Sequence, residues 1–321
     1  MRQWAKLGLA LSFTLLSVPS LARAWDGFGH ELTAYIAYQD LKPETKAWVN
    51  ELLRRHPQYD LLATNCPSGF DKDEYIFMRA AIWPDMMRDE KLDPGMKEHH
   101  GPWHYINFPV GPVAHGDAPD RTWKSGTDPE NILQALAKCE ADLQDSETAE
   151  PEKAKRLCWI EHLVGDSHQP LHTVSLFSRD FEHGDLGGNL FIVSEKGKIQ
   201  KLHAFWDGVL GASDDAHKVV ERGKEMRKSK DVSRAALKSD LGKGPYSDWV
   251  NAGVELAKTV AYDNGKLQGA KSIDKDHLPA KAPELPDGYR KKAEAVARKQ
   301  VALAGFRLAY KLNEALPPGK Q

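Results

Sequence analysis

The amino-acid sequence predicts an all-α fold, a single mostly helical domain with a short β-hairpin close to a predicted metal site. Apolar residues recur at helical spacing almost throughout the chain, and only one segment shows a hairpin pattern. No repeat, low-complexity tract or second-domain boundary interrupts this pattern. With 321 residues, 41% of them apolar and 28% charged, the chain can bury a full-sized core.

Residues 1–24 have the composition of a secretory signal peptide. Arg2 and Lys6 precede the apolar run Leu7–Val18, and Ala22-Arg23-Ala24 forms a small-x-small cleavage site. The alternative is an uncleaved membrane anchor, but the apolar run is shorter than the roughly 20 residues that a span needs. We therefore expect the functional domain to comprise residues 25–321 and the mature protein to have no membrane anchor.

The remaining chain reads as eight helices, one hairpin and two long loops. The predicted helices span 29–40, 43–55, 72–82, 129–143, 152–167, 204–212, 245–263 and 287–313. The predicted hairpin pairs residues 189–194 with 199–202 and places Gly197 in its turn. Segments 107–128 and 264–287 are rich in Pro, Gly and Asp, which predicts surface loops.

Three cysteines remain in the mature chain, Cys66, Cys139 and Cys158. Cys139 and Cys158 lie on consecutive predicted helices, almost symmetrically about the polar connection 145–151. An antiparallel helical hairpin in an exported protein would bring them face to face, which favours a disulfide bond between them. The alternative is three small buried apolar side chains.

The charge balance excludes a broadly basic surface for binding polyanions. The whole chain has 44 basic and 46 acidic residues. Loss of Arg2, Lys6 and Arg23 with the signal peptide leaves 41 basic residues against 46 acidic ones. Any attraction for phosphate must therefore be local, from bound cations or a few placed basic side chains.

Two His-x-x-x-Asp motifs indicate metal binding. His162 and Asp166 are four residues apart on a predicted helix, so their side chains share one face and can hold one metal ion or two adjacent ones. His172 follows in the turn after that helix. His203 and Asp207 repeat the same spacing. A third pair at 56 and 60 contains Pro57, which would disrupt a continuous helix, so we do not interpret it as a site.

Three further candidates are weaker when each is taken alone. Asp85 follows Trp83-Pro84, and His104 lies between two aromatic residues. A single His among aromatics is more often a packed core residue than a ligand. His30 lies five residues after Trp25, whose α-amino group would be freed by cleavage. With a pKa near 7.7–8, such an amino group can bind a metal ion.

These pieces together resemble the single-strand-specific zinc nucleases of the S-one/P-one type, a family with fungal, plant and bacterial members. The resemblance covers nearly the whole mature chain, and the motifs occur in the family's order. They are Trp25 with Gly29-His30, Trp83-Pro-Asp85, Trp103-His104-Tyr105, the run 162–172, Gly187-Gly188-Asn189, Leu202-His203 and Trp206-Asp207. Each motif is short, but their combined order and spacing are specific to this family.

The resemblance implies three zinc ions per chain. One would be bound by Asp85, His104, His162 and Asp166. The second would be bound by the amino nitrogen and carbonyl oxygen of Trp25, by His30 and by Asp166, which bridges the pair. The third would be bound by His172, His203 and Asp207. Imidazole and carboxylate are usual ligands where zinc keeps a position open for water and substrate.

The resemblance also implies a zinc-dependent phosphodiesterase that cleaves single-stranded DNA and RNA to 5′-phosphate products. In that reading Asp85 and Asp166 act through the metal, and Arg88 and Asn189 hold the phosphate and stabilise its developing charge. Tyr105 would stack on a base, although core packing is an equal alternative for it.

Asn107 departs from the family, since the fungal enzymes carry an acidic residue in this part of the base pocket. The departure leaves the base preference open. Activity as a 3′-nucleotidase also stays open.

Two alternative functions share part of this pattern. A zinc phospholipase C shares the fold and the zinc arrangement, but it has a longer spacing from its N-terminal Trp to its first His and a Glu in place of Asp207. A non-catalytic exported zinc-binding protein would favour mobile His-rich tracts, and the sequence has none. We expect an exported monomer, periplasmic or secreted, whose partners are single-stranded nucleic acids and nucleotides.

Overall fold

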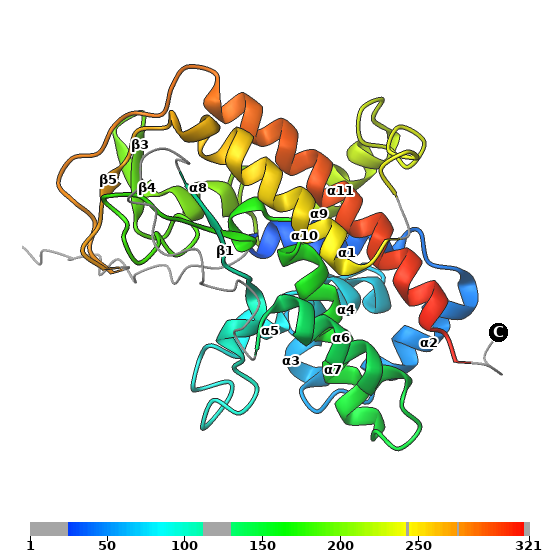
Figure 1. Cartoon of the computed structure of the whole chain (residues 1–321). Helices are drawn as coiled ribbons and strands as arrows, with labels where there is room; N and C mark the ends of the chain where they lie inside the picture. Colours follow the sequence, from blue (N-terminus) through cyan, green and yellow to red (C-terminus); the bar gives the residue numbers. More distant parts are fainter. Residues whose placement is uncertain (1–24, 112–129, 242–243, 275, 318–321) are drawn as a thin grey trace, which may run out of the picture.

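Long helices lie side by side around one buried core, and a small strand region covers one end of the molecule (Figure 1). The structure is a computed structural model that describes residues 25–111, 130–241, 244–274 and 276–317. Its α-helices are α1 (Gly27–Tyr38), α2 (Pro43–Leu53), α3 (Tyr59–Ala63), α4 (Lys72–Ala80), α5 (Trp83–Met86), α6 (Ile132–Gln144), α7 (Glu150–Asp166), α8 (Leu202–Asp207), α9 (Ala216–Lys228), α10 (Tyr246–Leu256) and α11 (Tyr289–Ala315). The predicted all-α class is confirmed.

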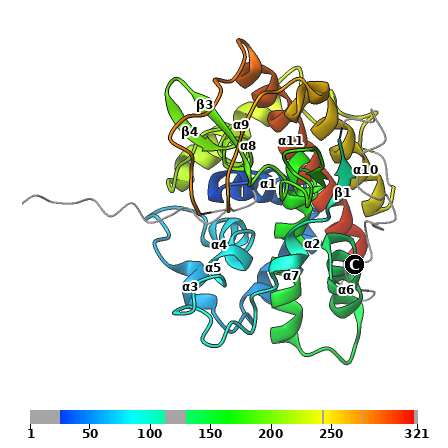
Figure 2. The ribbon, with the colours of Figure 1, turned by 60° about the vertical axis from the view of Figure 1, so that its left-hand side comes forward.

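Helix α1 is the central element of the core. All its residues after Gly27 are buried, and it packs against α4, α7, α9 and α11. Close approach to α11 depends on Gly305, where an added Cβ would lie 2.7 Å from the Ile36 side chain. Figure 2 shows α1 in blue near the middle of the molecule. Any polar side chain on α1 is therefore buried and needs a specific partner.

Helix α7 brings its last turns into the same core. Its residues from Leu157 to Asp166 are all buried. The preceding α6 begins with a capping box formed by Asn131 and Gln134, and it packs along α7. The 3₁₀ turn η2 (Pro170–His172) follows, because proline cannot continue the helix. This break turns the chain back beside the end of α7.

The strands form two small sheets near that turn. Strands β1 (Phe108–Val110) and β2 (Val174–Leu176) pair in parallel. Strands β3 (Phe191–Glu195) and β4 (Lys198–Lys201) form the predicted hairpin, with Gly197 in its turn at a φ of 81°. Strand β5 (Ala270–Lys271) pairs with β3. The predicted loops 107–128 and 264–287 therefore each contain a short strand among their described residues.

Several predicted helix boundaries were wrong. The helix predicted at 204–212 spans Leu202–Asp207 and ends at Gly208. The helix predicted at 245–263 changes after Leu256 into a π-helical turn, η3 (Ala257–Ala261), followed by the 3₁₀ turn η4 (Asp263–Gly265). Helix α9 and the short helices α3 and α5 were not predicted.

The predicted disulfide bond is also wrong, because all three cysteines are free thiols. Cys139 in α6 and Cys158 in α7 are fully buried. Packing two helices together does not ensure the short Cβ–Cβ distance and facing directions that a disulfide requires. Burial raises the pKa of Cys139 to about 12 and that of Cys158 well above its usual value. Both side chains therefore pack as small apolar groups.

The predicted signal peptide, residues 1–24, lies outside the described residues. Among the residues that the structure describes, none of the helices has the length and apolar character to cross a membrane.

Candidate metal centre

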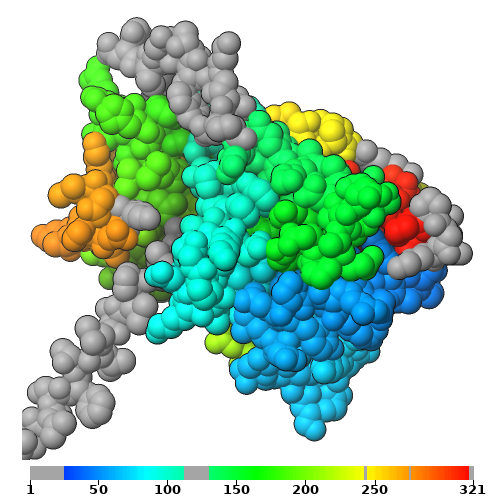
Figure 3. All heavy atoms as spheres, turned by 90° about the horizontal axis from the view of Figure 1, so that it is seen from below, coloured from blue at the N-terminus to red at the C-terminus, as the bar shows by residue number. Residues whose placement is uncertain are grey.

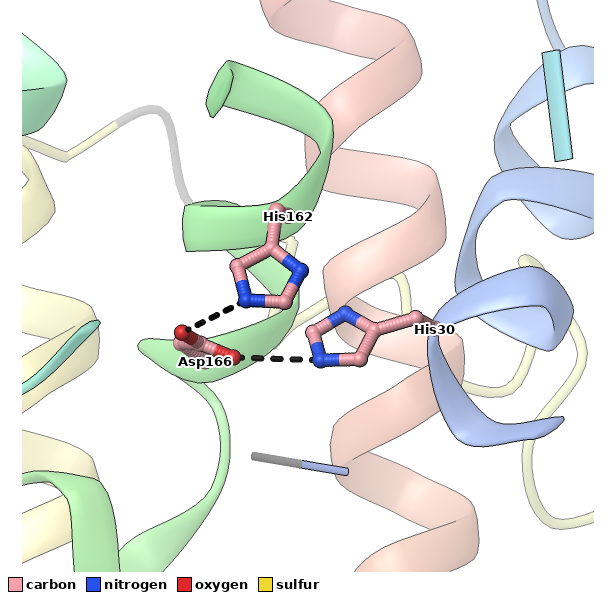
Figure 4. A group of neighbouring side chains, drawn as sticks. All are labelled: His30, His162 and Asp166. Atoms are coloured by element: carbon pink, nitrogen blue, oxygen red, sulfur yellow. Dashed lines mark ion pairs between the residues drawn. The ribbon is translucent and has the colours of Figure 1, made fainter. Parts of the chain in front are cut away.

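The Asp166 carboxylate lies at the centre of a buried group of imidazoles. Its Oδ1 is 3.2 Å from Nε2 of His30. Its Oδ2 is 3.0 Å from Nδ1 of His104 and 3.2 Å from Nε2 of His162. All four side chains are at most 1% exposed. Figure 4 shows His30 from α1 and His162 from α7 both pointing toward Asp166. The two carboxylate oxygens thus face different imidazoles.

A glycine and a tryptophan hold the α1 side of this group. The rings of His30 and His162 stack with their centroids 4.0 Å apart. An added Cβ at Gly165 would lie 2.8 Å from Nδ1 of His30, so only glycine leaves room for the imidazole. The Trp25 indole N–H donates to the Gly165 carbonyl at 3.1 Å. Trp25 is fully buried, which fixes the start of the described chain against the end of α7.

Asp85 joins this group from α5. Pro84 sets the first turn of this short helix, and Oδ1 of Asp85 lies 3.9 Å from Nε2 of His162. The same oxygen is 3.0 Å from Nε of Arg88. His162 Nδ1 donates to the Ala81 carbonyl at 2.8 Å, which directs its Nε2 toward the two carboxylates. Metal-binding histidines commonly have such a carbonyl partner on their other nitrogen.

A second buried group contains His172, His203 and Asp207. The two imidazole Nε2 atoms are 3.1 Å apart, and Oδ2 of Asp207 is 3.7 Å from Nε2 of His203. His172 Nδ1 donates to the His104 carbonyl at 2.6 Å, and His203 Nδ1 donates to the Gly187 carbonyl at 2.6 Å. Each ring therefore presents Nε2 to the other, although two neutral nitrogens at this distance need a proton or a cation between them.

Burial sets the electrostatics of both groups. Burial lowers the pKa of His104 and His203 to about 3, so both imidazoles are neutral and able to bind a metal ion. Burial also raises the pKa of Asp207 well above its usual value. For Asp166, burial would raise the pKa, but His162 and His172 hold it well below its usual range. A buried carboxylate such as Asp207 needs a positive partner to stay ionised.

The ligand chemistry fits zinc. Three sets of buried side chains each bring their ligand atoms within 4.8 Å of one another, namely His30, His162 and Asp166; Asp85, His104 and His162; and His172, His203 and Asp207. Within the described part of the chain, Nδ1 of His30 and Nε2 of His104 are buried without a hydrogen-bond partner. Imidazole nitrogens and carboxylate oxygens in sets of this size are typical zinc ligands.

All eight histidine and aspartate ligands predicted from the sequence lie in these sets, and His56 lies in none. The grouping differs from the expected one, since His162 belongs to two sets, whereas Asp166, expected in two, belongs to one. Trp25 lies next to both regions, because the Asp26 amide donates to the Asp207 carbonyl at 3.1 Å. The amino group of Trp25 can be a ligand only if the chain is cleaved after residue 24, and residues 1–24 lie outside the described residues. This ligand role therefore stays a prediction.

A pocket of about 350 Å³ opens beside the metal-ligand sets. Figure 3 shows one face on which the cyan segment near residues 90–110 lies close to the light-green β3–β4 region. The pocket is lined by Arg88, His99, Gly101, Pro102, His104, Tyr105, Asn107, Leu171, His172, Leu186, Asn189, Lys201, His203 and Asp276. His104, His172 and His203 belong both to this lining and to the metal-ligand sets. A molecule in the pocket would therefore lie directly beside those sets.

All four residues predicted to contact substrate line this pocket: Arg88, Tyr105, Asn107 and Asn189. Tyr105 is 38% exposed, so the core-packing alternative for it is wrong. Sequence reasoning missed His99, Leu186, Lys201 and Asp276. Leu186 directly precedes the Gly187-Gly188-Asn189 motif and is 48% exposed, a position the motif could have indicated. No local pattern marks the other three.

Comparisons with known proteins find one family and several relatives that match this chain. The sequence pattern of the family described as S1/P1 Nuclease matches residues 25–317. The chain is 24% identical to Nuclease S1 of Aspergillus oryzae over 312 residues, which cover 95% of this chain and 96% of that protein. It is 24% identical to Endonuclease 4 of Arabidopsis thaliana over 336 residues, 98% of this chain and 95% of that protein. Nuclease P1 of Penicillium citrinum is 25% identical over 187 residues, 57% of each chain.

Proposed function

Since the chain belongs to the S1/P1 nuclease family, we propose that its buried His and Asp sets bind zinc and that the adjoining pocket binds single-stranded nucleic acid. The protein is a phosphodiester hydrolase, a zinc-dependent single-strand nuclease. Both DNA and RNA are substrates in this proposal, and the products carry 5′-phosphates. The single observation that carries the proposal is the group of imidazoles around the buried Asp166 carboxylate beside an open pocket.

Three zinc ions would be held by this chain's own residues. Asp85, His104, His162 and Asp166 hold the first ion. The amino nitrogen and carbonyl oxygen of Trp25, with His30 and Asp166, hold the second. His172, His203 and Asp207 hold the third, and Gln169 steadies Asp207 by donating to its Oδ1 at 2.8 Å. When bound, zinc would lower the pKa of a water molecule and so supply a hydroxide nucleophile near neutral pH.

The pocket residues position the substrate for that attack. The Arg88 guanidinium lies beside Asp85 and lines the pocket, where it binds the phosphate and balances charge that develops on it. Asn189 binds the same phosphate through its side-chain amide. The exposed Tyr105 ring stacks on a base, and Asn107 contacts the base edge. Base stacking tolerates any sequence, whereas Asn107 sets the preference among bases.

The protein is exported in this proposal. Cleavage after Ala24 removes residues 1–24 and leaves a monomeric domain of residues 25–321 in the periplasm or outside the cell. The zinc phospholipase C alternative is not favoured by the family match. The non-catalytic zinc-binding alternative does not explain why a pocket with Arg88 and Asn189 opens onto the ligand sets.

A substrate panel with controlled zinc tests the proposal. The exported protein is incubated with single-stranded DNA, RNA, duplex DNA, a 3′-nucleotide and phosphatidylcholine vesicles. We expect cleavage of both single strands, complete loss of activity after treatment with EDTA, and recovery when Zn²⁺ but not Mg²⁺ is restored. Hydrolysis of phosphatidylcholine without nuclease activity would support the phospholipase instead. Zinc binding without turnover of any substrate would support the scavenging protein.

A further inference from the structure

The loop that carries Asn189 has an unusual backbone. Gly184, Leu186, Gly187 and Gly188 all have positive φ, from 54° to 84°. Leu186 adopts a left-handed backbone conformation although it has a side chain, and this conformation costs of order 1 kcal/mol or more. An added Cβ at Gly187 would lie 2.4 Å from the Leu171 carbonyl oxygen, so this loop also packs tightly on η2. Such a loop keeps its shape only if surrounding groups hold it.

A buried carboxylate lies inside this loop. Asp185 is fully buried, and its Oδ1 accepts from the Leu176 amide at 2.8 Å. Its Oδ2 accepts from the Tyr262 hydroxyl at 2.7 Å. Burial raises the pKa of Asp185 to about 6, and the nearby amides of Gly187 and Gly188 act in the opposite direction. One side chain of the loop is therefore bonded both to β2 and to the residue that follows η3.

Tyr262 is the side chain that donates a hydrogen bond to this carboxylate. It follows the π-helical turn η3 and is 3% exposed. Its ring packs against Phe191 of β3 with the centroids 5.8 Å apart. A π-helical turn in an otherwise α-helical segment often occurs at a functional site. Here the residue directly after the turn, Tyr262, is the one whose hydroxyl donates to Asp185.

The loop in turn contacts the metal-ligand set of His203. The Gly187 carbonyl accepts from Nδ1 of His203 at 2.6 Å, and the Gly188 carbonyl accepts from the His203 amide at 3.2 Å. The side-chain amide of Asn189 donates to the Leu186 carbonyl at 2.9 Å. A shift of this loop would therefore turn the imidazole and move the phosphate-binding amide together.

We propose that Asp185 and Tyr262 are positioning residues that hold the 184–189 loop, and thereby direct Nε2 of His203 toward zinc and the Asn189 amide into the pocket. The proposal rests on the function proposed above. Neither residue touches substrate or metal. Both act through backbone carbonyls and amides, and partners of this kind typically change metal affinity or activity by about 10–100-fold when they are removed.

The test compares Tyr262→Phe with Tyr246→Phe. Tyr246 is a matched control because it is also buried and donates to a carboxylate, Glu140, at 2.6 Å, outside the loop and the pocket. For each purified holoenzyme we would measure zinc release to a chromogenic chelator, kcat and KM on single-stranded DNA, and the Tm of the metal-free protein. For Tyr262→Phe we expect one zinc ion to be released at least about 10-fold faster and kcat to fall by a similar factor. Tyr246→Phe should release zinc as the wild type does.

A second pair of variants separates positioning from stability. Asp185→Asn keeps one acceptor oxygen and should lose less zinc affinity than Asp185→Ala. The proposal is overturned if Tyr262→Phe lowers only the Tm of the metal-free protein while its zinc release and kcat equal those of the wild type. If Asp185→Ala does not fold, Tyr262→Phe and Asp185→Asn still decide the question. Zinc release is measured without substrate, so it does not depend on nuclease activity. A wild-type protein without nuclease activity would contradict the proposed function, but the zinc-release comparison would still test the positioning role.

Discussion

Three imidazoles of the metal centre are oriented in the same way. His162, His172 and His203 each donate Nδ1–H to a backbone carbonyl, and each presents Nε2 to the site. A carbonyl partner fixes the tautomer and the ring plane, so these three nitrogens are held in place before any metal arrives. Asp166 differs because both of its oxygens face imidazoles. Its loss should therefore affect more than one ion.

Substitution of Asp166 tests this difference at the scale of one residue. Asp166→Asn keeps the size of the side chain but removes the negative charge that faces His30, His104 and His162. We expect metal analysis to show loss of more than one zinc ion per chain, and activity to fall about 100-fold further than in Asp207→Asn, because several kcal/mol of charge stabilisation disappear. A full zinc complement with near-normal cleavage in Asp166→Asn would show that this carboxylate does not bridge two ions.

At the scale of elements, the sequence was informative where periodicity and motif coincide. The helix predicted at 152–167 corresponds to α7, and the spacing of His162 and Asp166 on it correctly placed both side chains on one face. The hairpin was predictable because a glycine, Gly197, lies between its two strands. Glycine tolerates the positive φ that the structure shows there. These features depend on neighbouring residues alone, so local reasoning could find them.

Other elements depend on contacts between distant segments, which a local sequence pattern does not show. Helix α9 buries only Ala216, Val219, Gly223 and Met226, and two of these are too small to give a clear apolar stripe. Strands β1 and β2 contain three residues each and pair across more than sixty residues of chain. The pocket-lining residues Lys201 and Asp276 come together for the same reason, through the packing of distant segments.

The contact between α9 and α1 yields a prediction at this scale. An added Cβ at Gly223 would lie 2.2 Å from Cδ1 of the buried Tyr35 ring. Gly223→Ala should gain up to about 1 kcal/mol of helix propensity but lose about 1–3 kcal/mol to overpacking, so we expect a lower free energy of unfolding. Urea denaturation of the metal-free protein measures it, with the exposed Lys218→Ala of the same helix as the control. A Gly223→Ala variant more stable than the wild type would show that α9 moves freely away from α1.

At the scale of the whole molecule, the candidate metal-ligand sets gather residues from positions 30 to 207 around the buried helix α1. His30 comes from α1, Asp85 from α5, His104 from the 3₁₀ turn η1 (Gly101–His104), and Asp166 from α7. The order of the motifs along the chain could be predicted, but their convergence depends on how α1, α5 and α7 pack. This convergence matters for charge, because a chain with a net charge of −2 would attract phosphate mainly where the proposed zinc ions and Arg88 lie close together.

If residues 1–24 are removed as proposed, the new start of the chain would connect export with catalysis. The Trp25 indole is bonded to Gly165, which precedes Asp166, and the next amide, that of Asp26, is bonded to the Asp207 carbonyl. Residue 25 is thus anchored between two regions that supply ligands. A free amino group here can bind zinc, whereas the amide nitrogen of an uncleaved chain is a poor ligand. Enzyme retained in the cytoplasm would then be inactive against the cell's own RNA.

A protein that starts with one extra residue before Trp25 tests this connection. The extended and the correctly cleaved proteins are purified, reconstituted with Zn²⁺ and compared by metal analysis, far-UV circular dichroism and cleavage of single-stranded DNA. We expect the extended protein to keep its helical fold, to bind roughly one zinc ion fewer per chain and to lose most of its activity, since one ion of the proposed pair lacks its N-terminal ligand. Because Trp25 and all other side chains are unchanged, a loss can be assigned to the blocked amino group. Equal zinc content and equal cleavage rates in the two proteins would exclude that group as a ligand.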